Sequence, residues 1–217
     1  ASAMELVVDN GGIAWHYRFV PMDPNASLSD ADKLTGGTSK TWKWHYMAKG
    51  HLGCGEPGTE GLNWWSANAL EKNNCGLYDD ILTFAADGTY TMDPGAGGTV
   101  YVNKDSGVRA DLNPNDGNDY QVPLEKQTAT WNLSTEGGVM YLEFPTQTIV
   151  GYVPNSNAYT TPRFRVLNLT ANLLELAIDD AGITWHYLFV PASFEGDELS
   201  ASDFAQGMLG AWTWEPS

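Results

Sequence analysis

The sequence predicts an all-β protein, either an antiparallel β-sandwich or an up-and-down β-barrel with long loops. Three observations predict this class: alternating apolar stretches that pair around short turns, 23 glycines among 217 residues, and no amphipathic helix of full length. A count of about eight to ten antiparallel strands suits either architecture.

Three segments each contain two strand-like stretches around a turn rich in glycine or aspartate. The pairs are 174–178 with 183–190, 81–84 with 89–92, and 128–133 with 139–144, the last around a turn at 134–138. We also expect 164–169 to pair with 173–178. Ser and Asp cap residues predict short helical turns at 29–34 and 200–206.

The charge balance excludes several classes of partner. The chain has 27 acidic and 11 basic side chains and a net charge of −16. Nucleic acids and anionic membranes are bound through Lys and Arg, so we expect neither as a partner, and polyanionic polysaccharides are disfavoured. No apolar run approaches the roughly 18 to 20 residues of a membrane helix, so no membrane-spanning segment is predicted.

An internal repeat divides the chain. Residues 5–21 recur as 175–191, and the same offset of 170 carries Trp42 and Trp44 onto Trp212 and Trp214. The repeat predicts a tandem array of modules: residues 1–21 are the closing hairpin of a preceding repeat or accessory strands, 22–191 are one β module, and 192–217 open the next. A single domain with pseudo-symmetric ends is the alternative.

Residues 34–44, 76–90 and 173–191 resemble the lipocalin-like modules of Bacteroidetes surface proteins. The stretches 50–53 and 64–67 resemble insertions in modules of polysaccharide-utilisation proteins. The resemblance implies a lipocalin-like fold and a noncatalytic module that binds a glycan or accompanies a glycan-degrading enzyme. It also implies a secreted protein or one on the outer-membrane surface of a Gram-negative bacterium.

The nine tryptophans separate into two groups. Six belong to repeated pairs on strands, and their period of two predicts that they are core residues: Trp15, Trp42, Trp44, Trp185, Trp212 and Trp214. Trp131 lies mid-strand and is also expected in the core. Trp64 and Trp65 differ, because they lie in a loop rich in Gly and Asn, where binding residues are common.

We predict that this loop is a sugar-binding site. Sugars are bound by flat aromatic faces together with polar groups that bond the hydroxyls. The candidate ligand-binding residues are Trp64, Trp65, His51, Asn63, Tyr78 and Glu71. A loop that plugs the barrel end is the alternative. Cys54 and Cys75 flank the loop and form either one disulfide or two buried free thiols.

No nucleophile or metalloprotease motif is present, and we assign no catalytic residue. A stretch of alternating oxygen ligands around Gly117 is similar to a calcium loop, with Ca²⁺ as the candidate cofactor. Its candidate ligands are Asp111, Asn113, Asn115 and Asp119. A solvated acidic loop is the alternative.

The sequence therefore predicts a noncatalytic carbohydrate-binding module for a neutral plant polysaccharide, with β-glucan or xyloglucan favoured. Its expected partners are a polysaccharide or oligosaccharide and neighbouring modules of the same polypeptide. Two alternatives remain: a glycoside hydrolase domain acting on β-glucan, which needs two carboxylates across a cleft, and a structural spacer of a surface protein.

Overall fold

The structure is a computed structural model that describes residues 4–10, 13–19, 28–112, 117–180 and 182–194, and the side chains from residue 28 onward. Its elements, in chain order, are β1 (Met4–Asn10), β2 (Ile13–Phe19), α1 (Asp30–Thr35), β3 (Ser39–Trp44), β4 (Leu52–Gly55), β5 (Trp65–Ser66), β6 (Ile81–Ala85), β7 (Thr89–Asp93), the 3₁₀ turn η1 (Gly95–Gly97), β8 (Thr99–Asn103), β9 (Asp119–Pro123), β10 (Gln127–Thr130), β11 (Asn132–Glu136), β12 (Val139–Glu143), α2 (Asn157–Thr160), β13 (Arg163–Leu169), β14 (Leu174–Asp180) and β15 (Ile183–Pro191).

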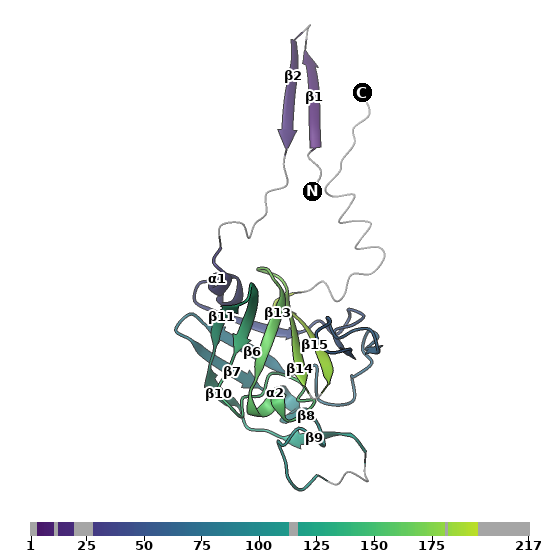
Figure 1. The fold of residues 1–217 in the computed structure, drawn as a ribbon. Coiled ribbons are helices and arrows are strands. Elements are labelled where there is room, and N and C mark those ends of the chain that lie inside the picture. Colours follow the sequence, from purple (N-terminus) through teal and green to yellow (C-terminus); the bar gives the residue numbers. More distant parts are fainter. Residues whose placement is uncertain (1–3, 11–12, 20–27, 113–116, 181, 195–217) are drawn as a thin grey trace.

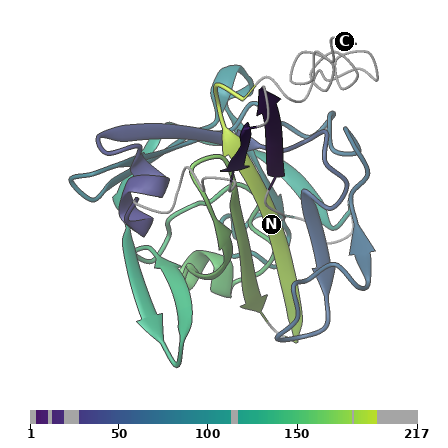
Figure 2. The same cartoon turned by 90° about the horizontal axis from the view of Figure 1, so that it is seen from above.

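The main sheet is a nearly closed antiparallel barrel, which confirms the predicted all-β class. Its strands are ordered β10-β7-β6-β3-β15-β14-β13-β12-β11, and Figures 1 and 2 show them curving around one centre. Most neighbours in this order follow one another in the chain, but β4 and β5 lie in sequence between β3 and β6, and β8 and β9 lie between β7 and β10. The β3–β15 pair joins the start of the barrel to its end. This is the up-and-down form of the two predicted architectures.

The barrel closes at a bend around Trp131. β10 pairs with β7 on one side of the bend, and β11 pairs with β12 on the other. The predicted hairpin at 128–144 is therefore wrong in detail, because residues 128–133 do not form one strand and the turn is reduced to Gly137 and Gly138. The Trp131 backbone N–H donates to Gly88 O and its indole N–H to Ala85 O, which fixes the bend.

The other predicted hairpins are confirmed. β6 pairs with β7, β13 with β14, and β14 with β15. α1 begins where the cap chemistry predicts, since the Ser29 hydroxyl accepts the Asp32 backbone N–H at 3.0 Å. The predicted helical turn at 200–206 lies outside the described residues.

Aromatic side chains fill the barrel. Trp42 and Trp44 are fully buried, as predicted for the repeated tryptophans, and Trp131 is partly buried against the same core. The largest further rings of this core are Phe84, Tyr90, Phe164, Tyr187 and Phe189. A barrel filled by its own side chains leaves its ends and its surface for a ligand.

β1 and β2 form a separate two-stranded sheet, drawn apart from the barrel in Figure 1. The division of the chain into 1–21, 22–191 and 192–217 stays a prediction, and residues 195–217 lie outside the described part. No helix among the described residues is long and apolar enough to cross a membrane.

Candidate functional site

A pocket of about 260 Å³ lies at one mouth of the barrel. Side chains alternate along a strand, so Trp185 shares the inward face of β15 with Tyr187 and Phe189. Those two rings are fully buried, whereas Trp185 is partly exposed at the strand's end. Segments that are distant in sequence complete the lining: Leu52, Cys54, Trp65, Lys72, Tyr101, Asp119, Tyr152 and Trp185.

Four aromatic rings form most of the pocket wall. The Tyr101 and Tyr152 ring centroids lie 5.2 Å apart, and those of Tyr152 and Trp185 lie 5.4 Å apart. The Lys72 Nζ lies 5.1 Å from the Trp65 ring centroid and 5.5 Å from that of Tyr101, so its ammonium bridges these two walls. The pocket thus offers flat apolar faces beside a cation that is already held by cation–π contacts.

Asp119 is the one carboxylate among the described residues that line the pocket. Its oxygens accept the Tyr152 hydroxyl at 2.7 Å, the Asn103 Nδ2 at 3.1 Å and the Tyr101 hydroxyl at 3.3 Å. Burial, and next the nearby Asp119 charge, raise the pKa of both tyrosines, which stay protonated donors at neutral pH. The Trp185 Nε1 is buried and has no hydrogen-bond partner among the described residues.

A buried chain of hydrogen bonds positions Lys72. The Lys72 backbone N–H donates to the Tyr78 hydroxyl oxygen, and the Tyr78 hydroxyl lies 2.8 Å from His51 Nε2. The other ring nitrogen of His51 lies 2.7 Å from Ala48 O, which only accepts, so Nδ1 carries the proton and Nε2 accepts from Tyr78. Burial lowers the pKa of His51, in keeping with a neutral ring, and raises that of Tyr78 to about 12.

Of the predicted site residues, some line the pocket, some lie behind its wall, and others lie outside it. Trp65 lines the pocket, whereas Trp64 is 54% exposed and is not among the lining residues. His51 is fully buried and Tyr78 is partly buried, and they hold the Lys72 backbone through the hydrogen bonds described above. The Glu71 carboxylate is exposed and accepts the backbone N–H of Asn68 at 2.7 Å, which lowers its pKa.

Asn63 belongs to the loop that joins β4 to β5. Its side-chain oxygen accepts the Glu56 backbone N–H at 2.9 Å, which ties the two ends of this loop together. Trp64 follows at once, and its backbone N–H donates to Cys54 O. The loop therefore sets the register of β5 and the direction in which Trp65 points.

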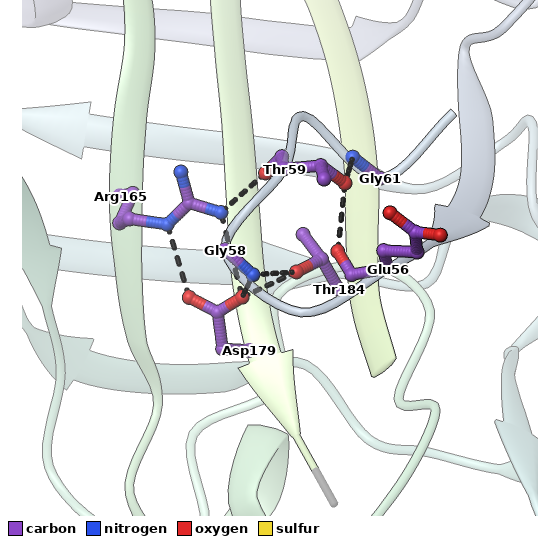
Figure 3. Close-up of polar contacts among 7 residues, drawn as sticks. All are labelled: Glu56, Gly58, Thr59, Gly61, Arg165, Asp179 and Thr184. Carbon is purple, nitrogen blue, oxygen red and sulfur yellow. Dashed lines mark hydrogen bonds and ion pairs between the residues drawn. The ribbon is translucent and has the colours of Figure 1, made fainter. Parts of the chain in front are cut away.

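A network centred on Asp179 holds this loop against the outside of β13, β14 and β15 (Figure 3). The Asp179 carboxylate accepts the Gly58 backbone N–H at 2.9 Å, the Arg165 Nε at 3.0 Å and the Thr184 hydroxyl. Arg165 donates a further hydrogen bond to Thr59 O. Burial raises the pKa of Asp179, but these hydrogen bonds and the Arg165 charge outweigh it, so the net shift is downward.

Gly61 allows the closest approach of the loop to the barrel. A Cβ on Gly61 would lie 2.8 Å from Thr184 O and 3.1 Å from His186 N, and its φ of +80° also favours glycine. The β4–β5 loop thus rests directly on the backbone of β15.

Both cysteines are free thiols, so the structure contains no disulfide between them, and both are partly rather than fully buried. Cys54 lines the pocket, and the Cys75 thiol donates to Lys72 O at 3.0 Å. Burial raises the pKa of Cys75 to about 11, which keeps this thiol protonated and able to fix the Lys72 turn.

The predicted calcium ligands are only partly described, because Asn113 and Asn115 lie in the undescribed segment 113–116. The exposed Asp111 carboxylate pairs with the Arg109 guanidinium, and Asp119 faces the pocket. Among the described residues, no group of three or more His, Cys, Asp or Glu side chains could hold a metal ion.

A larger and more open hollow of about 610 Å³ lies elsewhere on the surface. It is lined mainly by Thr and Gln side chains: Thr89, Gln127, Thr128, Ala129, Thr130, Pro145, Thr146, Gln147 and Thr148. Because it presents no ring for stacking, the barrel-mouth pocket is the candidate site.

Sequence reasoning missed Lys72, Tyr101 and Tyr152, and it placed Trp185 in the core and Asp119 in a calcium loop. The alternation of buried Val100 and Val102 with Tyr101 was the available signal for an outward-facing ring. Nothing in the sequence showed that Tyr101 of β8 and Asp119 of β9 share a pocket with Trp185 of β15. No protein-family model matches the chain, and no curated protein matches it significantly.

Proposed function

We propose that the protein is a noncatalytic carbohydrate-binding module that takes a sugar ring of a neutral polysaccharide, with β-glucan or xyloglucan favoured, into the barrel-mouth pocket. The observation that carries this proposal is the wall of four aromatic rings beside one carboxylate and one ammonium. Pyranose rings need this combination, because their C–H faces stack on aromatic rings while their hydroxyls donate to carboxylates and accept from ammonium groups.

The size and charge of the pocket narrow the ligand class. A volume of about 260 Å³ is slightly below that of ordinary ligand pockets, which span roughly 300–1,000 Å³, so the pocket suits one ring rather than several. Lys72 already provides the cation above Trp65 and Tyr101, which disfavours a cationic ligand. A glycosidase needs two carboxylates across its cleft, and Asp119 alone lines the described part of this pocket.

Affinity electrophoresis in gels that contain soluble β-glucan, xyloglucan or other neutral polysaccharides tests the proposal. We expect at least one neutral polysaccharide to retard the protein. Trp65→Ala should weaken binding by about 2 kcal/mol, or roughly 30-fold, as for other buried aromatic anchors.

Trp64→Ala is the matched control, because Trp64 is the adjacent indole but is 54% exposed and outside the pocket lining. Its binding should stay close to that of the wild type. Absence of retardation by every polysaccharide, or equal retardation of Trp65→Ala and the wild type, would contradict the proposal. Release of reducing sugar would instead favour the hydrolase alternative.

A further inference from the structure

The hairpin β1–β2 has the same strand register as the closing hairpin β14–β15. Met4 pairs with Phe19 and Asn10 with Ile13, and residues 170 positions later repeat both pairs as Leu174 with Phe189 and Asp180 with Ile183. The sequence repeat therefore extends to the pairing of the two strands.

The residues that bury β14–β15 in the barrel recur in β1–β2. Tyr187 and Phe189 are fully buried, and the Tyr187 hydroxyl donates to Tyr152 O at 2.9 Å. The Tyr187 ring also stacks on Trp44, with centroids 5.6 Å apart. Identical residues in the two hairpins are Glu5 and Glu175, Leu6 and Leu176, Asp9 and Asp179, Gly12 and Gly182, Ile13 and Ile183, Trp15 and Trp185, His16 and His186, Tyr17 and Tyr187, and Phe19 and Phe189.

The barrel holds β14–β15 on both edges. β14 pairs with β13, as in Arg165 opposite Ala177, and β15 pairs with β4 and β3, as in Leu52 opposite Tyr187. Within the described residues, β1–β2 pairs with no barrel strand. A two-stranded hairpin alone is marginally stable in water, so its apolar positions call for a barrel to pack against.

We propose that β1–β2 is a second closing hairpin, which docks between the β13 and β4 strands of another copy of this chain when that barrel's own β14–β15 is displaced. In the docked state Val7 lies opposite Arg165 of the other copy, and Tyr17 lies opposite Leu52 of the other copy. Exchange of equivalent elements is a low-cost route to association between copies.

Two differences make β1–β2 the weaker of the two hairpins. Ala14 stands in place of Thr184, whose hydroxyl bonds Asp179 and accepts the Gly58 N–H. Val7 stands in place of the buried Ala177, which adds volume to a filled site. When β14–β15 is intact, it therefore occupies the barrel in preference to β1–β2.

The test disables one hairpin at a time in the full chain. Tyr187→Asp places a carboxylate at a fully buried position, whereas Tyr17→Asp changes the equivalent position of β1–β2. We expect Tyr17→Asp to be a folded monomer, Tyr187→Asp to be a folded dimer, and the double variant to lose cooperative unfolding. Circular dichroism during thermal unfolding and analytical ultracentrifugation measure the two properties.

Disulfide cross-linking gives a second readout in a Cys54→Ser, Cys75→Ser background that also carries Tyr187→Asp. Glu175 pairs with Asn168, and Glu5 is its counterpart in β1–β2, so the cysteine pair Glu5→Cys and Asn168→Cys should form a disulfide between two chains. The control pair is Glu175→Cys and Asn168→Cys with Tyr187 intact, and it should form a disulfide within one chain. Equal behaviour of Tyr187→Asp and the double variant, whether both are folded or both unfolded, overturns the proposal. If Tyr187→Asp is folded but monomeric, β1–β2 closes the barrel of its own chain, and docking in a second copy is overturned.

Discussion

Removing the Asp179 carboxylate should release the β4–β5 loop and lower the stability of the barrel. In the variant Asp179→Ala, the Gly58 N–H and the Thr184 hydroxyl lose an acceptor, and the Arg165 guanidinium loses its carboxylate partner. The loop then keeps the hydrogen bond from Arg165 to Thr59 O and the backbone contact at Gly61.

The magnitude follows from the exposure of the two charged groups. Hydrogen bonds to charged groups contribute about 1.5–3 kcal/mol when buried, and surface pairs about 0–1 kcal/mol. The Arg165 side chain is 18% exposed and that of Asp179 is 44% exposed. The three lost interactions together should therefore contribute about 2–3 kcal/mol, well below the sum for three buried hydrogen bonds. For a chain of this size that corresponds to a decrease in Tm of about 4–12 °C.

Thermal and urea unfolding measure the loss, and hydrogen exchange at the Gly58 amide reports on the loop. Asp105→Ala is the matched control, because its pair with Lys104 is exposed and should contribute less than about 1 kcal/mol. The pKa of Asp179 is lowered in the fold, so its contribution is present above about pH 4 and is lost as the pH falls through the folded pKa. An unchanged Tm together with a still protected Gly58 amide would refute the role of this network.

Two further substitutions test the contacts of the loop and the core. Gly61→Ala should lower the free energy of unfolding in urea by at least about 1 kcal/mol more than Gly58→Ala does. Both glycines have positive φ, but only a Cβ at Gly61 meets backbone atoms. Equal losses of stability in the two variants would mean that the loop does not rest on β15. Burial raises the pKa of Asp80 well above its usual value, so the folded state disfavours the charged carboxylate, and the contribution of this group to stability falls as the pH rises from about 4. Asp80→Asn should therefore become progressively more stable than the wild type towards neutral pH, and a difference that stays constant between pH 4 and 8 would contradict this.

Local patterns were sufficient to predict most of the barrel. The stretches that became β6, β7, β13, β14 and β15 alternate apolar and polar residues around short turns, and this period directly decides which face is buried. The bend at Trp131 was not predictable in this way, because residues 128–133 read as one continuous strand. The stretch is divided only because its first half pairs with β7 as β10 and its second half pairs with β12 as β11.

The pocket was less predictable than the barrel for a related reason. Trp65 was accessible to sequence reasoning because adjacent indoles in a loop are unusual. Its partners Tyr101, Tyr152 and Trp185 come from three segments that the fold brings together at the barrel mouth. No local period in the sequence predicts that these three segments come together, and the paired indoles pointed to the loop without giving its neighbours.

The repeat links the pocket to the closure of the barrel. Trp185 forms one wall of the pocket and lies on β15, two residues from the buried Tyr187 that closes the core. Trp15 and Tyr17 keep that spacing in β1–β2, so a barrel closed by β1–β2 would regain the pocket wall together with the core ring. It would not regain the Thr184 hydroxyl that completes the Asp179 network, since Ala14 occupies that position. A module closed in this way should therefore keep the aromatic site while its β4–β5 loop is held less firmly.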